Sequence, residues 1–433
     1  MLLTIIACIP TVNSMAQSAA EQAQSLIEQG YAQAAAGQFA EAIANYRAAL
    51  QMAPHNVKAE IGLAQAYRGV RNFDAAKEIL ERAHREHPKN AAPLAVLGDL
   101  DIQLQTYEVA IAHLSAALTL DPGSAEARNR LAVAYKAKGD ASDALAQISK
   151  ILAHDANDAL AHYTRGQVYA DQNKDSLALP DAEKVVEMQP KNPSGRLLLA
   201  KILVRAPDGA KPEEIKQRCV RAAAALEPLI ESTSTDAQTL FLLSRAYQCA
   251  GQDEKAQKTL AEFEKASQND RTTNENKTQA KHLVQQANEL AIKNDFAGSL
   301  DVLQQAIAMD STYAAAYSQL AKLYYSAGDI EKASEAITQA LTREPYHPEY
   351  LYVRGKILEK ESNLDEALAA FQQTTLVNPK ESDAYFEMGV IYQQRGDGAK
   401  ALAAYKKALE LSPDDPDYKR ALASLNGSHS PAP

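Results

Sequence analysis

The stretch SDAYFEMGVIYQQRGDGAKALAAYKKALELSP, from Ser382 to Pro413, decides the fold because its apolar residues follow two helical patterns in succession. Apolar positions three and four apart in each half predict two amphipathic helices joined by a tight turn. The residues that set these patterns are Gly389 and Tyr392 in the first half, Gly396 at the break, and Ala401, Tyr405 and Ala408 in the second half. One such hairpin cannot bury both of its faces, so the sequence requires neighbouring hairpins.

The same unit recurs along the chain, and a proline often closes it. Steps of about 34 residues connect these prolines, and Ala156 takes the proline's place once. The prolines are Pro54, Pro88, Pro122 and Pro190 in the first half and Pro345, Pro379 and Pro413 in the second. The period and the Leu-Gly, Tyr, Ala, Phe and Pro spacing resemble the tetratricopeptide repeat (TPR), from about Ala23 to about Lys419.

This resemblance implies an all-α fold, a right-handed superhelical TPR solenoid of about eleven helix-turn-helix units with a C-terminal capping helix. The organisation we expect is a signal-like leader (1–20), an N-terminal array of seven units (21–270), a polar linker (271–279), a C-terminal array of four units plus the cap (280–425), and a disordered tail (426–433). The sixth unit carries an insertion, APDGAKP, from Ala206 to Pro212.

Two residues depart from the repeat pattern. Asp101 stands where an aromatic residue is usual, and its carboxylate requires either solvent or a hydrogen-bond donor. Pro180 falls past the first turn of a second helix, where its ring and missing N–H predict a kinked or delayed helix. The polar stretch Ser267–Gln279 is either a linker or an extended helix start.

Composition limits the classes of partner. The 433 residues are 46% hydrophobic and 23% charged, with a formal net charge of -10, so no long-range field attracts a polyanion. We therefore expect protein or peptide segments as partners and no nucleic acid. The oligomeric state does not follow from the sequence.

The N-terminus has features of an export signal. An apolar run from Leu2 to Pro10 is followed by small residues, with a cleavage-like site after Ala16, although no Lys or Arg precedes the run. Cys8 lies in a lipobox-like context and would carry a lipid anchor if the chain is a lipoprotein. These features predict a periplasmic or otherwise extracytoplasmic protein, with a cytoplasmic one as the alternative. No other apolar run reaches the length of a membrane span.

The other two cysteines are compatible with a disulfide. Cys219 is expected in the second helix of the sixth unit and Cys249 at the end of the first helix of the seventh, at a similar height in antiparallel helices. A disulfide between them is one hypothesis, and two packed thiols are the other.

No catalytic or cofactor motif is present. The sequence contains no phosphate-binding loop, nucleophile elbow or zinc motif. His84 and His87 share a helix face but lie in a last turn, where imidazoles interact with the terminal carbonyls. We therefore expect no enzyme activity, no metal and no cofactor.

The TPR resemblance places a partner-binding groove along the first helix of each unit, with its fifth and ninth positions facing the groove. The candidate residues are Lys322, Tyr325, Tyr352, Lys356 and Phe386 in the C-terminal array and Tyr163, Phe241 and Arg245 in the N-terminal array. They suit an extended peptide with hydrophobic anchors and an acidic group. The alternative is that they only pack between neighbouring first helices. The Lys, Asn and Arg clamp of chaperone-binding TPR proteins is not kept in the first three units.

A second set of cations lies near the middle of the chain. It either holds an anionic ligand or balances local acidic residues, and its members are Arg130, Lys136, Lys201, Arg205 and Arg245.

Taken together, the resemblance implies a non-enzymatic scaffold that docks protein segments, in envelope assembly, secretion or polysaccharide export of a bacterium. The alternatives are a cytosolic adaptor or co-chaperone, and the regulatory subunit of a separate enzyme.

Overall fold

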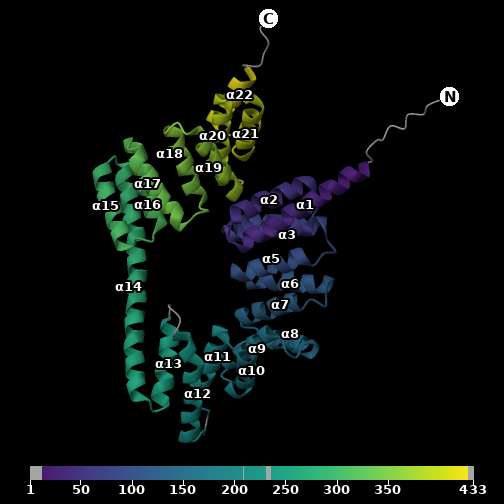
Figure 1. Cartoon of the computed structure of the whole chain (residues 1–433), viewed down its shortest axis with the longest axis vertical. Helices are drawn as coiled ribbons and strands as arrows, with labels where there is room; N and C mark the ends of the chain where they lie inside the picture. Colours follow the sequence, from purple (N-terminus) through teal and green to yellow (C-terminus); the bar gives the residue numbers. More distant parts are fainter. Residues whose placement is uncertain (1–11, 208, 231–235, 428–433) are drawn as a thin grey trace, which may run out of the picture. The chain divides into compact units, whose positions relative to one another are not determined.

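A computed structural model of the chain describes residues 12–207, 209–230 and 236–427 (Figure 1). Within these ranges the chain is helical, with tight turns and no strand. The expected all-α repeat fold is therefore confirmed. Residues 1–11 and 428–433, which contain Cys8, the whole apolar run of the expected leader and most of the expected tail, lie outside the described residues. No described helix combines the length and the apolar character needed to cross a bilayer.

The helices follow one another in antiparallel pairs. They are α1 (Val12–Ala35), α2 (Phe39–Met52), α3 (Val57–Gly69), α4 (Phe73–Glu86), α5 (Ala92–Gln103), α6 (Tyr107–Leu120), α7 (Ala125–Lys138), α8 (Ala141–His154), α9 (Ala159–Asp171), α10 (Asp175–Met188), α11 (Pro193–Leu203), α12 (Pro212–Ile230), α13 (Ala237–Cys249), α14 (Asp253–Ile292), α15 (Phe296–Met309), α16 (Ala314–Ala327), α17 (Ile330–Arg343), α18 (Pro348–Lys360), α19 (Leu364–Val377), α20 (Ser382–Gln394), α21 (Gly398–Leu411) and α22 (Pro416–Gly427).

The described residues form two compact units. One contains those of Met1–Glu86 together with those of Glu275–Pro433, and the other contains those of His87–Asn274. The first unit therefore combines the first two repeats with the last four. This division differs from the expected one, in which the first seven repeats form one array.

Each hairpin is held by the close approach of its two helices. In the last repeat, a Cβ atom on Gly389 would lie 2.5 Å from the ring of Tyr405, so only glycine lets α20 and α21 meet at this distance. Gly355 and Phe371 form the corresponding pair in the tenth repeat, at the same 2.5 Å. Tyr405 and Phe371 are fully buried, and the second helix thus contributes one large ring to a gap that the first helix leaves open.

The turn inside each hairpin uses one left-handed residue. Gly396 has a φ of 77°, and the N–H of the next residue, Asp397, returns to the carbonyl of Tyr392 at 2.9 Å. Asp397 then accepts a hydrogen bond from the backbone N–H of Lys400 and caps α21. Residues other than glycine also adopt this conformation, namely Arg71, Gln105, Asn173, Asn294 and Ser362.

The expected polar linker is part of a helix. Residues 271–279 lie within α14, a single helix of 40 residues that runs from Asp253 to Ile292. This stretch contains neither proline nor glycine, so nothing in it stops a helix, and its polar side chains face solvent. The boundary between the two compact units lies within this helix, after Asn274.

Of the two residues that depart from the repeat pattern, Asp101 behaves as predicted and Pro180 does not. Asp101 is buried at 2% exposure and accepts hydrogen bonds from His113 Nδ1 at 2.7 Å and from Thr106 Oγ1 at 3.2 Å, as its position required. The expectation that Pro180 delays its helix is wrong, because α10 begins at Asp175 and continues through the proline. Pro180 costs this helix one backbone hydrogen bond.

The C-terminal cap ends slightly later than expected and is part of the core. Helix α22 begins at Pro416 and ends at Gly427, two residues beyond the predicted end of the cap at residue 425. Its Tyr418 and Leu425 are buried, and Tyr418 stacks on Phe386 of α20 with ring centroids 4.9 Å apart. This covers the apolar face of the last hairpin.

Replacing Gly389 with alanine tests the close approach within a hairpin. The added Cβ overlaps the Tyr405 ring, and we expect the free energy of unfolding to fall by about 1 to 3 kcal/mol. Gly123→Ala is the matched control, since its Cβ would meet only Asp121 Oδ1, at 3.4 Å. Urea denaturation followed by circular dichroism measures both. Equal midpoints for the two variants would show that α20 and α21 do not meet at Gly389.

Candidate partner-binding surfaces

The predicted C-terminal groove residues lie on α16, α18 and α20, the first helices of the last three repeats. Tyr352 and Lys356 lie one turn apart on α18 and both contact Glu387 of α20. Lys356 Nζ lies 2.9 Å from Glu387 Oε1 and 2.7 Å from Glu359 Oε2, and the Tyr352 hydroxyl donates to Glu387 at 3.4 Å. The chain thus supplies its own carboxylates to the cation that we expected to receive a partner's acidic group.

The electrostatics of this network keep Lys356 charged. Burial lowers the pKa of Lys356, but its hydrogen bonds with Glu359 and Glu387 outweigh this effect, so the pKa is raised overall. Burial raises the pKa of the Glu387 carboxyl, against the effect of the Lys356 ammonium. Burial also raises the pKa of the Tyr352 hydroxyl, and the Glu387 charge adds to the effect. The three groups therefore form an internal polar contact between repeats ten and eleven.

Phe386 has a packing role in addition to its groove position. Its ring lies between Tyr418 and Tyr405, with centroids 4.9 Å and 5.7 Å away, and it is only partly exposed. The alternative interpretation of the sequence, packing between neighbouring helices, describes this residue well. The sequence reasoning did not single out Tyr418, because the cap lies outside the repeat register.

The Lys322 side chain is more accessible than that of Lys356, at 39% against 28% exposure. Lys322 forms an ion pair with Glu349, in which both side chains are exposed by more than a third. Exposed pairs of this kind contribute little free energy and exchange readily with other anions. Tyr325 packs at the edge of the core formed by the ninth repeat and is only partly buried.

The predicted residues of the other compact unit include an exposed aromatic and cation pair. Phe241 lies on α13, is 39% exposed, and contacts Phe263 of α14 with ring centroids 5.3 Å apart. The Arg245 guanidinium lies 5.8 Å from the centre of the Phe241 ring. No described carboxylate forms an ion pair with Arg245. Tyr163, the third predicted residue here, accepts a hydrogen bond from Gln167 and is partly buried.

The remaining central cations have partners within the chain. Arg130 pairs with Asp99, Lys201 with Asp171 and Arg205 with Asp175, and Lys136 donates to Gln167. The structure therefore does not bring them together with Arg245 as one anion site. Most of them balance local acidic residues, which leaves Arg245 as the distinct member of the set.

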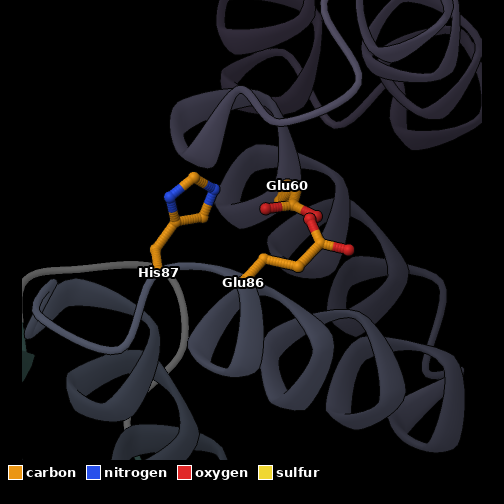
Figure 2. A group of neighbouring side chains, drawn as sticks. All are labelled: Glu60, Glu86 and His87. Atoms are coloured by element: carbon orange, nitrogen blue, oxygen red, sulfur yellow. The ribbon is translucent and has the colours of Figure 1, made fainter.

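Figure 2 shows three potential metal ligands: Glu60 of α3, Glu86 at the end of α4, and His87, which follows it. One ligand atom of each lies within 4.8 Å of the others. Glu60 is fully buried at a repeat position that holds Leu in the third, seventh and tenth repeats. Arg82 Nε lies 3.5 Å from Glu60 Oε1, and His55 Nδ1 lies 3.0 Å from Glu86 Oε2. Each carboxylate thus has a side-chain partner within the chain, and we assign both a structural role. The sequence singled out His87 but gave no sign of Glu60.

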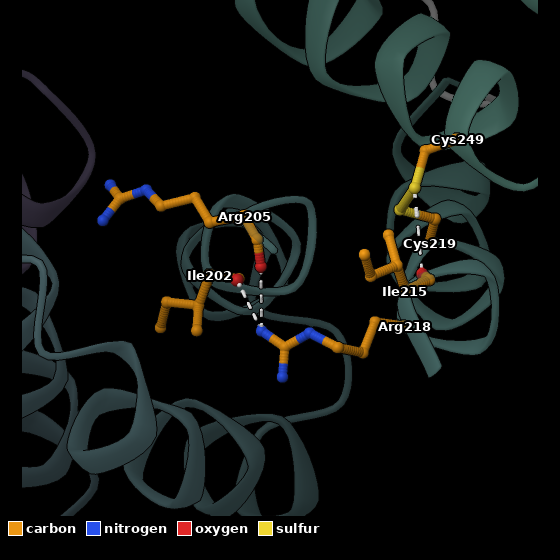
Figure 3. The surroundings of a disulfide bond; sticks show 6 residues. All are labelled: Ile202, Arg205, Ile215, Arg218, Cys219 and Cys249. Atoms are coloured by element: carbon orange, nitrogen blue, oxygen red, sulfur yellow. Dashed lines mark hydrogen bonds between the residues drawn. A yellow bond between two sulfur atoms is a disulfide. The ribbon is translucent and has the colours of Figure 1, made fainter. Parts of the chain in front are cut away.

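The two cysteines of the central repeats are joined in a disulfide (Figure 3). Cys219 lies within α12 and Cys249 ends α13, with their Cα atoms 5.7 Å apart. The neighbouring Arg218 donates hydrogen bonds to the carbonyls of Ile202 and Arg205, at 3.0 and 3.2 Å. Three successive chain segments are therefore tied together beside the insertion of the sixth repeat.

Comparison with protein families decides the class of the chain. One model described as tetratricopeptide repeat matches residues 33–100, 101–168 and 290–357, and a second with the same description matches residues 355–426. The chain is a TPR protein. The matched residues lie in the helical pairs of the structure. TPR proteins serve in general as protein-interaction scaffolds.

Two solved structures resemble parts of this TPR protein. The crystal structure of MamA is 21% identical, with a TM-score of 0.31, and the match covers 33% of this chain and 83% of MamA. The crystal structure of YrrB, described as a TPR protein with an unusual peptide-binding site, is 23% identical, with a TM-score of 0.34, over 42% of this chain and 94% of YrrB. Similarity at this level carries no argument about function. Curated proteins give no match to the chain.

Reduction of the disulfide tests its contribution to this TPR protein. The bond spans a sequence separation of 30 residues, and cross-linking a loop of that size stabilises the folded state by about 3 to 4 kcal/mol. We expect urea denaturation with a phosphine reductant to show a lower midpoint than without it. The variant Cys219→Ser with Cys249→Ser is the control and should not respond to reductant. A wild-type midpoint insensitive to reductant would contradict the bond.

Proposed function

We propose that this TPR protein is a non-enzymatic scaffold that binds an extended segment of another protein through the exposed pair Phe241 and Arg245. A ring that is 39% exposed, beside a guanidinium without a carboxylate partner among the described residues, is the observation that carries the proposal. An apolar or aromatic side chain of the partner packs against Phe241 and Phe263. An acidic side chain next to it pairs with Arg245.

The C-terminal groove contributes a second, weaker contact surface in this proposal. Lys322 is the residue there whose ion pair is exposed on both sides, so a partner carboxylate can replace Glu349 at small cost. Tyr352 and Lys356 keep their contacts with Glu387 and shape the surface instead of binding directly.

The setting we propose is extracytoplasmic, in envelope assembly, secretion or polysaccharide export of a bacterium. The disulfide between Cys219 and Cys249 supports this setting, because structural disulfides persist in oxidising compartments. The apolar run from Leu2 to Pro10 supports it independently. N-terminal sequencing of the mature chain tests the proposal. A start after Ala16 or nearby supports export, and an intact Met1 favours the cytosolic adaptor.

Loss of the exposed pair tests the binding surface. Peptides selected by phage display against the purified protein supply a ligand, and fluorescence anisotropy gives its Kd. We expect Phe241→Ala with Arg245→Ala to raise the Kd at least about tenfold, which corresponds to about 1.4 kcal/mol. Ile292→Ala is the control, since this side chain is 82% exposed at the end of α14 and lies outside the predicted groove.

The result that would contradict this surface is an unchanged Kd for the double variant. If Lys322→Ala then raised the Kd instead, the C-terminal groove would be the binding site. If neither variant changed the Kd while the chain kept its helical circular dichroism, the first-helix faces would not be the surface that binds.

A further inference from the structure

The first two repeats and the tenth repeat touch each other, although about 300 residues of chain separate them. Helix α2 packs against α19 within the compact unit that combines the first two repeats with the last four. Adjacent TPR repeats pack because the chain connects them in order. A contact between the first and the tenth repeat has no such cause and depends on specific side chains.

The first of these side chains is Asn72, which precedes α4. Its Oδ1 atom accepts a hydrogen bond from the backbone N–H of Ala75 at 3.1 Å and so caps the helix. Its Nδ2 atom donates to the carbonyl of Val377 at 2.8 Å. Val377 is the last residue of α19, where the backbone carbonyls lack partners within the helix. One amide group thus joins the start of one helix to the end of another.

The second contact involves Tyr346, which follows the proline that closes the ninth repeat. Its hydroxyl donates to the carbonyl of Gly37 at 2.9 Å, and its ring meets Phe39 edge-on with centroids 6.0 Å apart. Gly37 is the left-handed residue in the turn of the first repeat. The apolar and polar parts of Tyr346 therefore both contact the same turn.

The third contact is an ion pair between Lys380 and Glu78. The two groups lie 3.1 Å apart, and their side chains are 68% and 63% exposed. An ion pair this exposed contributes little to stability and is screened by salt. The three contacts, Asn72 with Val377, Tyr346 with Gly37 and Phe39, and Lys380 with Glu78, are together called the terminal latch below.

The terminal latch lies beside a cavity of about 680 Å³. Arg47, Tyr67 and Arg82 line it from the first two repeats, and Lys380 and Tyr385 line it from the other side. Tyr385 belongs to α20, the first helix of the last repeat, which is one of the predicted groove helices. A segment that reaches this part of α20 therefore meets side chains of the first two repeats as well.

We propose that the terminal latch is an intramolecular docking site that opens and closes reversibly, with the chain's own tenth repeat as its occupant. Its contacts are two hydrogen bonds, one edge-on aromatic contact and one exposed ion pair, and polar contacts of this kind between parts of one chain allow relative motion. Covalent connection within one chain gives a high effective concentration and favours the closed state. In that state the latch restricts access to Tyr385 and the neighbouring part of the last repeat.

The Lys380 and Glu78 pair allows a direct test by zero-length cross-linking. A water-soluble carbodiimide activates the Glu78 carboxyl, and the Lys380 amine replaces the activated group to form an amide. With the dilute full-length protein, we expect mass spectrometry of the monomer band to show this cross-link. Raising the salt from 0.01 M to 1 M shortens the screening length from about 30 Å to about 3 Å, and we expect the yield to fall severalfold.

Charge exchange provides the matched variants. Lys380→Glu places two carboxylates together and should abolish the cross-link, and adding Glu78→Lys to it should restore the cross-link with the roles exchanged. Both residues are exposed, so neither change should alter the helical circular dichroism. A cross-link found only in the dimer band would mean that the surfaces join two copies, and would overturn the proposal. Absence of the cross-link from the wild-type monomer at low salt would also overturn it.

Discussion

The approach of two helices to within contact of one large ring is the constraint on which the structure depends. Gly389 and Gly355 leave no side chain where α20 and α18 meet their partners, and Tyr405 and Phe371 fill the gap. Because the ring comes from the second helix and the gap from the first, the pair fixes the register of these two hairpins. The exposed sides of the first helices are then free to carry side chains that serve binding.

Much of the fold follows from the sequence, because a small residue on a first helix facing a larger apolar residue on the second recurs in other repeats, as with Gly98 and Leu114. The closing prolines, the small residues of the first helices and the large residues of the second helices predict the helical pairs and the cap. The left-handed turns at Arg71 and Gln105 were not predictable from residue type, since glycine takes this conformation at much lower cost. The sequence left both a linker and an extended helix start open for Ser267–Gln279, because a polar stretch is compatible with either, and only the structure shows that α14 runs through it without a break.

The binding surface was less predictable than the fold. Register placed Tyr352, Lys356 and Phe386 on first helices, where the structure has them, but it could not show that Glu387 and Tyr418 already contact them. Those partners come from the next repeat and from the cap, at separations that no repeat pattern specifies. By contrast, Arg245 has no carboxylate partner within the described residues, so an acidic segment gains more there than at Lys356. Cations that already pair with carboxylates of the chain contribute little binding free energy to an acidic segment of a partner.

The pairing of a glycine gap with a buried ring can be measured directly by a double-mutant cycle on the tenth repeat. Gly355→Ala and Phe371→Leu, alone and together, are compared by urea denaturation. The account predicts strong coupling, with the smaller side chain at residue 371 recovering at least about 1 kcal/mol of the stability lost at residue 355. Effects that add within about 0.5 kcal/mol would show that the two residues do not share one packing site, and would contradict the account.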